Sequence, residues 1–362
     1  MIRLMHAADL HLDSPWAGLN PAQAALMRAA QRDLCQRLGE QILRLRCDVV
    51  LLSGDLFDGQ TVYRQSLDVL KRALANCKAR VFIAPGNHDP YTPDSPYAKE
   101  HWPENVHIFT SPEITCVELP ELGCRVYGAA FTGPIQGNVL RGFAARQDDL
   151  VNLMVLHADP GEGESEYGPV SKQDIGGSGL DYLALGHIHK RFARKIGSTF
   201  VGMPGCPMGR GFDETGEKGA YFVTAQKGDC QIRFLPLGAP RYEALEVPAG
   251  DDPLSALVSA LPEQAKQDHY RVRLTGPLAT APDLPALEQA LADRFASLTI
   301  LDETQRVLPL WEDLEENSLR GAFLRLLKQE HDGAGEDPDR QSVLELAGKL
   351  TLELMDGREV NL

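Results

Sequence analysis

Polar side chains that can bind metal ions follow five short apolar segments of this chain, and their order along the sequence is its most constraining feature. The segments alternate with helical patterns, which favours an α/β architecture with a mostly parallel sheet. Ligand sites of such sheets form at the carboxyl ends of the strands. The residues that end or follow the five segments are Asp9 and His11, then Asp55, then Asn87, His88 and Asp89, then His157, and finally His187 and His189.

The periodicity of the apolar residues predicts the elements between these positions. Residues 2–8 are expected to form a strand, and residues 21–46 a long amphipathic helix. The side of this helix that we expect to be buried carries Leu26, Leu34, Leu38 and Ile42. Further strands are expected at residues 48–53, 80–84, 114–119, 125–128, 151–156 and 182–185, with a helix at residues 61–77.

The candidate ligands comprise three oxygen donors and four imidazoles. This number exceeds the needs of one tetrahedral ion and suits two ions that share a carboxylate. Mixed nitrogen and oxygen ligands without thiolate favour Mn, Fe or Zn over Ca. Two ions roughly 3.5–4 Å apart activate a water molecule and neutralise a phosphate, which is the chemistry of phosphate ester cleavage. The seven candidates are Asp9, His11, Asp55, Asn87, His157, His187 and His189.

The ordered series D-x-H, G-D, G-N-H-D, a single His and G-H-x-H resembles the motif series of the calcineurin-like metallophosphoesterase superfamily. The resemblance covers residue 1 to about residue 240 and implies a β-sandwich flanked by helices (α/β/β/α). It also implies in-line attack by a metal-bridging hydroxide. One metal would be held by Asp9, His11, Asp55 and His189, and the other by Asp55, Asn87, His157 and His187. His88 would be the general acid that protonates the leaving oxygen, and Asp89 would orient it.

Within the superfamily, three segments look similar to the SbcD-type DNA repair exonucleases, and particularly to their YhaO-like branch. They are HAADLHLDSP at residues 6–15, SGDLFD at residues 53–58, and MPGCPMGR running into FDETGEKG at residues 203–219. This resemblance implies an exonuclease that works on single- or double-stranded DNA ends with an SbcC-type coiled-coil ATPase. It also implies a homodimer and two divalent ions, with Mn²⁺ as the first expectation and Fe, Zn or Mg as alternatives.

Three parts are expected along the chain: the nuclease domain at residues 1–240, a small βαβ capping domain at residues 241–305, and a helical tail at residues 306–362. The tail helices carry an apolar stripe that either packs in a core or docks the ATPase. Net charge is uneven, because residues 241–362 hold 12 Lys and Arg against 24 Asp and Glu, whereas residues 1–240 hold 24 against 27. An acidic tail on a nearly neutral body leaves a nucleic-acid partner open.

Few basic residues are candidates for contacts with DNA phosphates. Lys190 and Arg191 follow the last metal motif, where they could steer a strand or simply be solvated. Arg210 lies in a glycine-rich segment and either contacts a phosphate or pairs with Asp213 or Glu214.

Two other functions are compatible with this sequence. The same dinuclear site could serve a small-molecule phosphoesterase acting on cyclic nucleotides or nucleotide conjugates, for which an acidic surface is ordinary. A non-catalytic scaffold would be expected to have lost ligands, and every ligand position is filled here. Seven scattered cysteines without a C-x-x-C motif favour a reducing cytoplasm. The absence of a long apolar run argues against a membrane span.

Overall fold

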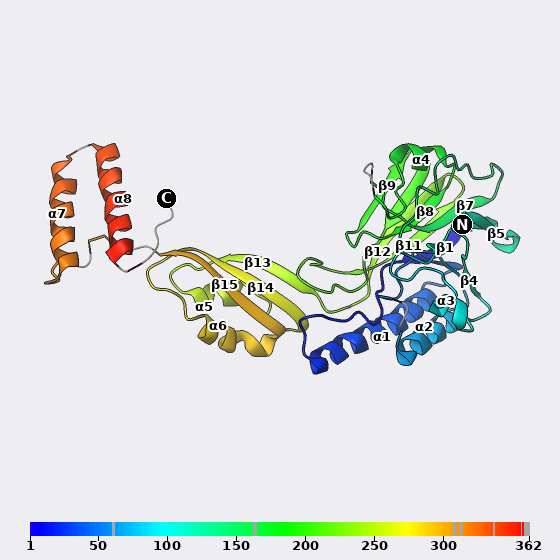
Figure 1. Ribbon diagram of the computed structural model, residues 1–362, viewed down its shortest axis with the longest axis horizontal. Coiled ribbons are helices and arrows are strands. Elements are labelled where there is room, and N and C mark those ends of the chain that lie inside the picture. The colour runs from blue at the N-terminus through cyan, green and yellow to red at the C-terminus, as the bar shows by residue number, and fades with distance from the viewer. Residues whose placement is uncertain are drawn as a thin grey trace. The chain divides into compact units, whose positions relative to one another are not determined.

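The computed structural model describes residues 1–59, 62–161, 165–306, 310–311, 314–335, 337–355 and 357. The chain divides into two compact units (Figure 1). The first comprises Met1–Glu243 with Gln267–His269, and the second comprises Ala244–Lys266 with Tyr270–Leu362. All candidate site residues lie in the first unit.

Two six-stranded sheets form the first unit. The first sheet has the order β12-β11-β1-β2-β3-β4, with β1 to β4 parallel and β11 antiparallel to β1. Its strands are β1 (Ile2–Ala7), β2 (Val49–Leu52), β3 (Arg80–Ile83), β4 (Val106–Ile108), β11 (Gly219–Gln226) and β12 (Asp229–Pro236). The second sheet has the order β5-β6-β7-β8-β10-β9, with β6, β7, β8 and β10 parallel. Its strands are β5 (Thr115–Leu119), β6 (Cys124–Gly128), β7 (Val151–His157), β8 (Tyr182–Gly186), β9 (Phe192–Ile196) and β10 (Thr199–Met203).

Alternating side chains of the strands fill separate core layers. Leu4, Leu51 and Phe82 of the first sheet face Val126 and Leu153 of the second sheet and form the core between the sheets. The residues next to them in each strand point outward, toward helices on the far side of each sheet. This arrangement is the helix-flanked β-sandwich that the family resemblance implies.

Helices cover the outer faces of the sheets. α1 (Pro21–Arg44) and α2 (Arg64–Asn76) pack on the first sheet, and α4 (Lys172–Gly177) packs on the second. The short helices α3 (Pro96–Lys99) and η1 (Pro120–Leu122) lie in connections. α1 begins at a capping box of Asn20 and Gln23, in which each side chain accepts a hydrogen bond from the backbone N–H of the other.

The predicted buried face of α1 is wrong at one residue, Leu26. Leu34, Leu38 and Ile42 are buried, but Leu26 is 70% exposed, and Met27 lies in the core instead. Met27 precedes Leu34 by seven residues, which is close to two full helical turns, whereas Leu26 precedes it by eight and turns away.

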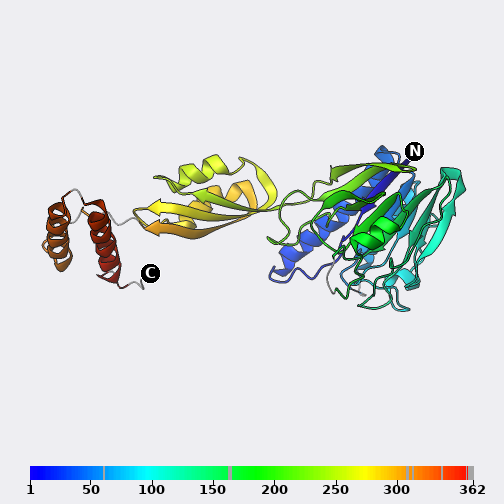
Figure 2. The ribbon, with the colours of Figure 1, turned by 90° about the horizontal axis from the view of Figure 1, so that it is seen from above.

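Most of a three-stranded sheet, order β13-β14-β15, lies in the second unit, together with the helices packed on it and a separate pair of helices. The first two helices of this part of the chain lie side by side against the sheet (Figure 2). The sheet with its two helices therefore has one strand and one helix more than the predicted βαβ unit. Its elements are β13 (Tyr242–Pro248), α5 (Pro253–Ala260), β14 (Ala265–Leu278), α6 (Leu284–Leu291), η2 (Ala292–Arg294) and β15 (Phe295–Arg306). The helices α7 (Leu319–Gly333) and α8 (Pro338–Met355) pack together around Leu324, Leu327 and Leu352.

The cysteines form no disulfide bonds. All seven are free thiols, and six of them are buried.

Among the described residues, no helix is both long and apolar enough to cross a bilayer. The predicted cytoplasmic location stays a prediction.

Candidate metal centre

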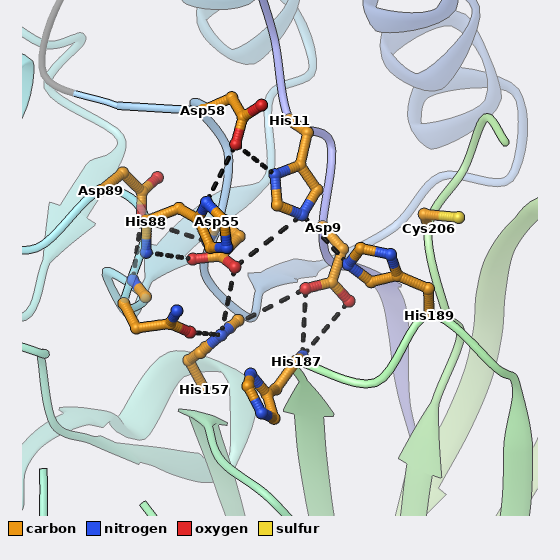
Figure 3. A network of polar contacts seen from close by, with 12 residues as sticks. Asp9, His11, Asp55, Asp58, His88, Asp89, His157, His187, His189 and Cys206 are labelled. Carbon is orange, nitrogen blue, oxygen red and sulfur yellow. Dashed lines mark hydrogen bonds and ion pairs between the residues drawn. The ribbon is translucent and has the colours of Figure 1, made fainter. Parts of the chain in front are cut away.

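The seven predicted ligands lie at one edge of the two sheets. Asp9 follows β1, Asp55 follows β2 and Asn87 follows β3 of the first sheet, whereas His157 ends β7 and His187 follows β8 of the second. Figure 3 shows Asp9, His11, Asp55, His157, His187 and His189 converging in one network of polar contacts. The carboxyl ends of the parallel strands therefore bring together residues that are up to 180 positions apart, counted from Asp9 to His189.

One group of converging side chains consists of Asp9, His11 and His189, whose candidate ligand atoms all lie within 4.8 Å of one another. The Nε2 atoms of His11 and His189 are 3.0 Å apart. The Nδ1 atom of each ring faces a carboxylate: His11 Nδ1 lies 3.3 Å from Asp58 Oδ1 and His189 Nδ1 lies 2.5 Å from Glu214 Oε1. Because an ionised carboxylate only accepts, the protons belong on Nδ1, and two Nε2 lone pairs face one point.

This geometry suits a cation between the two rings. Lone pairs at 3.0 Å repel each other unless a positive charge lies between them. Two nitrogen ligands at the roughly 2.1 Å bond length of metal–imidazole bonds, placed at a right angle, are about 3.0 Å apart. The residues present therefore fit a divalent metal ion.

A second group consists of Asp9, Asp55 and His157, again within 4.8 Å. His157 Nδ1 donates to the carbonyl oxygen of Ser53 at 2.9 Å, so its Nε2 lone pair faces Asn87 Oδ1 at 2.9 Å and Asp55 Oδ2 at 3.3 Å. Three acceptor atoms thus converge without a donor among them, which again suits a cation. Asp55 Oδ2 also lies 3.8 Å from His11 Nε2, between the two groups.

His187 joins the centre differently from the other six. Its backbone N–H donates to Asp9 Oδ1 at 3.0 Å. Its ring packs against the rings of His157 and Tyr167, with both centroid distances 5.2 Å. Among the described residues, the His187 ring belongs to neither converging group. Its role as a ligand stays a prediction.

The electrostatics of the buried carboxylates also call for positive charge. Asp9 and Asp55 are each 1% exposed. Burial, with the nearby charge of Asp55, raises the pKa of Asp9 well above its ordinary value. Burial also acts to raise the pKa of Asp55, but the neighbouring His157, His11 and His88 outweigh it and lower that pKa. Two buried carboxylates are costly unless a cation compensates them.

The backbone of the site is strained at its ligands. Asp9, His11, Asp55 and His187 all have positive φ angles, 53°, 44°, 50° and 109°. Such angles are uncommon for residues other than glycine, and they cluster at functional sites. Close packing adds a further constraint, because a Cβ atom at Gly86 would overlap Asp55 Oδ1. Glycine at position 86 therefore leaves room for the Asp55 carboxylate.

The carboxylate that faces His88 is not the predicted one. His88 Nδ1 lies 2.9 Å from Asp58 Oδ1, and the His88 side chain is 48% exposed. This hydrogen bond raises the pKa of His88, and the bonds from His11 and His88 lower the pKa of Asp58. The prediction that Asp89 orients His88 is therefore wrong for this structure.

Asp89 instead holds the surrounding loops. It is completely buried and accepts hydrogen bonds from the backbone N–H groups of Asp55, Leu56, Phe57 and Gly86 and from the hydroxyl of Tyr97. Burial and the charge of Asp55 raise its pKa to about 7. Asp89 thus fixes the loop that carries Asp55 and the turn before His88.

The three candidate phosphate-binding residues differ in their surroundings. The Arg210 guanidinium lies 3.2 Å from Glu214 Oε1 and 3.7 Å from Asp58 Oδ2, which places it beside the centre. Lys190 and Arg191 line a cavity of about 300 Å³ together with His189 and Lys218. The Arg191 guanidinium also lies over the ring of Phe234, with its central carbon 3.9 Å from the ring centroid. Contacts of these residues with DNA stay predictions.

Two residues of the site, Asp58 and Glu214, were missed as partners of the histidines. Asp58 lies in the segment SGDLFD and Glu214 in FDETGEKG, both of which carry the family resemblance. The family resemblance could therefore have singled out both carboxylates. Periodicity and ligand spacing do not reveal which histidine each carboxylate contacts.

Comparison with known proteins defines the class. The model of the calcineurin-like phosphoesterase family matches residues 2–191, just over half of the chain. The chain belongs to this family, whose members are phosphoester hydrolases with a site for two divalent ions.

Three relatives share sequence with this chain. The uncharacterized metallophosphoesterase YhaO of Bacillus subtilis (strain 168) is 32% identical over 245 residues, covering 64% of this chain and 60% of that protein. The SbcD subunit of nuclease SbcCD from Rhodobacter capsulatus is 25% identical, covering 83% of this chain and 87% of that protein. The DNA double-strand break repair protein Mre11 of Saccharolobus solfataricus is 25% identical, covering 63% and 61%. The matches thus span less than two thirds of the YhaO and Mre11 relatives.

Proposed function

We propose that this chain is a two-metal phosphodiesterase that degrades DNA from its ends. The observation that carries the metal assignment is the position of Asp55, whose Oδ2 atom lies 3.3 Å from His157 Nε2 and 3.8 Å from His11 Nε2. A carboxylate between two groups of imidazoles suits a bridging ligand. Support for DNA as the substrate comes from the relatives, one named as part of a nuclease and another as a DNA repair protein.

Each residue of the centre has a proposed part. Asp9, His11 and His189 would hold one ion, Asn87, His157 and His187 the other, and Asp55 both. Two ions in such a site supply a nucleophile from water and neutralise the charge of the phosphate. The half-exposed His88, held by Asp58, would donate a proton to the leaving oxygen. Mn²⁺ is the first choice of metal.

The tail is proposed to dock an SbcC-type ATPase. α7 and α8 bury one set of leucines between them, but several of their other apolar side chains face solvent, with Leu319 79% and Leu326 66% exposed. The proposal also includes a capping role for residues 241–305, a docking role for residues 306–362, a homodimer and a cytoplasmic location.

The test of this proposal is hydrolysis of end-labelled linear DNA by the purified chain with Mn²⁺, with bis(p-nitrophenyl) phosphate in parallel and Asp55→Asn as the blank. We expect both substrates to be cleaved by the wild-type chain and neither by the variant. The ladder of DNA products would give the polarity of digestion.

Other outcomes of this assay decide between alternatives. Cleavage of the small diester alone, unchanged after addition of an SbcC-type ATPase and ATP, would contradict the DNA assignment. It would favour a small-molecule phosphodiesterase. The net charge of −15 and the few basic residues near the site are consistent with that function. Cleavage of neither substrate would contradict the hydrolytic site itself.

A further inference from the structure

A buried carboxylate outside the predicted ligand set contacts His189. Glu214 follows β10 in a loop that lies beyond the residues matched by the family model. Its Oε1 atom lies 2.5 Å from His189 Nδ1, and its side chain is 8% exposed. From this geometry we propose that Glu214 is a positioning residue of the metal centre, which fixes the orientation and tautomer of His189 so that Nε2 faces the metal ion.

The tautomer follows from the contact itself. A ring nitrogen this close to an ionised carboxylate oxygen is favourable only when it carries the proton. Nδ1 is then the donor, and Nε2 keeps its lone pair, 3.0 Å from His11 Nε2 in the centre. Carboxylate–histidine pairs of this kind orient metal-binding imidazoles and make them better ligands.

Glu214 is itself held in place by several donors. Its Oε2 atom accepts from the backbone N–H of Arg210 at 2.8 Å, and the Cys206 thiol lies 3.7 Å from the same oxygen. Its Oε1 atom also accepts from Arg210 Nη2 at 3.2 Å. A side chain fixed by this many contacts can fix the ring that it touches.

The same contacts argue against a separate metal site at this position. The candidate ligand atoms of His189, Cys206 and Glu214 lie within 4.8 Å of one another. A cation among them would meet the Arg210 guanidinium, whose Nη2 atom lies 3.3 Å from His189 Nδ1 but donates to Glu214 Oε1, because a protonated Nδ1 cannot accept. The cluster is therefore a hydrogen-bond network that supports the metal centre from outside.

Arg210 extends this support to the other side of the centre. Its Nη1 atom lies 3.7 Å from Asp58 Oδ2, and Asp58 faces both His11 and His88. One guanidinium thus lies between the two carboxylates that contact three histidines of the site. This position explains how Glu214, Arg210 and Asp58 can hold these rings before any metal binds.

The inference rests on the proposed role of His189 as a metal ligand, and Mn²⁺ binding to the full chain tests both. Competition with a chromophoric chelator would compare the wild-type chain, Glu214→Gln, His189→Ala and the control Glu217→Gln, which alters an exposed carboxylate of the same loop. We expect Glu214→Gln to lower the affinity for one of the two bound Mn²⁺ ions about 10- to 100-fold, which is the usual effect of losing a partner that orients a metal ligand. The control should bind like the wild-type chain.

The outcomes separate the two proposals. Wild-type affinity in Glu214→Gln, with an ion lost in His189→Ala, would overturn the role of Glu214 alone. Wild-type affinity in both variants would overturn the metal assignment of His189. A lowered melting temperature of Glu214→Gln with unchanged affinity would show that Glu214 only stabilises its loop.

A second readout needs no metal. In the metal-free chain, ¹⁵N NMR of labelled histidine rings distinguishes a proton on Nδ1 from one on Nε2. We expect the His189 signals, identified from the His189→Ala spectrum, to report the Nδ1–H form in the wild-type chain and a mixture in Glu214→Ala. The same tautomer in both proteins would contradict the proposal.

Discussion

Asp55→Asn is expected to abolish hydrolysis of bis(p-nitrophenyl) phosphate and to weaken metal binding more than any other single substitution in the site. The Asp55 carboxylate lies between the imidazoles of His157 and His11, and its Oδ1 atom also accepts from the backbone N–H of His88 at 3.0 Å. An amide keeps the shape but removes the charge that a shared ligand supplies to both ions. The loss of Mn²⁺ affinity should exceed the roughly 10- to 100-fold effect of removing an outer partner.

A control for this substitution lies at the other end of the same strand. Asp48 precedes β2 and pairs with Arg3 at 3.0 Å, away from the metal centre. Asp48→Asn should keep full hydrolysis and full metal content. Turnover and metal content would be measured for both variants. An Asp55→Asn variant that retained two ions and a substantial rate would contradict the bridging role of Asp55.

His88→Ala is expected to keep both ions but to lower the turnover number about 10²- to 10⁴-fold, the usual contribution of a general acid or base. His88 forms a third cluster with His11 and Asp58, apart from the groups of Asp9 and Asp55, and its ring is oriented by Asp58 Oδ1 at 2.9 Å. Its half-exposed side chain can meet a substrate that enters from solvent. The loss should be smaller for a substrate with a good leaving group, because p-nitrophenolate needs little protonation.

The matched control is the exposed histidine His101. His101→Ala should retain the wild-type rate on every substrate. Full turnover of His88→Ala on DNA at intact metal content would rule out the proton-donor role, whereas loss of metal would mean that His88 acts as a ligand.

The parts of the fold that follow local patterns could be predicted from the sequence. The strands before Asp9, Asp55 and Asn87 are short apolar segments, and α1 and α2 between them have helical periodicity. β11 and β12 were not foreseen, although they pair with each other in a local hairpin; the pairing of β11 with β1, across more than 200 residues as at Ile2 and Ala225, is the part that the sequence does not reveal. Pairing over such a separation depends on tertiary packing, which local periodicity does not contain.

The site shows the same division. The candidate ligands could be chosen by residue type and strand order, because parallel strands end at one edge of a sheet. The partners of the histidines could not. Asp89 is adjacent to His88 in sequence but points into the core, while Asp58 reaches His88 from a loop 30 residues earlier. Glu214 reaches His189 from 25 residues further on.

The most direct test of the central claim is the number of Mn²⁺ ions that the wild-type chain binds, measured by equilibrium dialysis with the Asp55→Asn variant alongside. Two converging groups on either side of one carboxylate predict two ions per chain, and fewer in the variant. A single ion per wild-type chain, or equal binding by both proteins, would contradict the dinuclear centre on which the proposed hydrolysis depends.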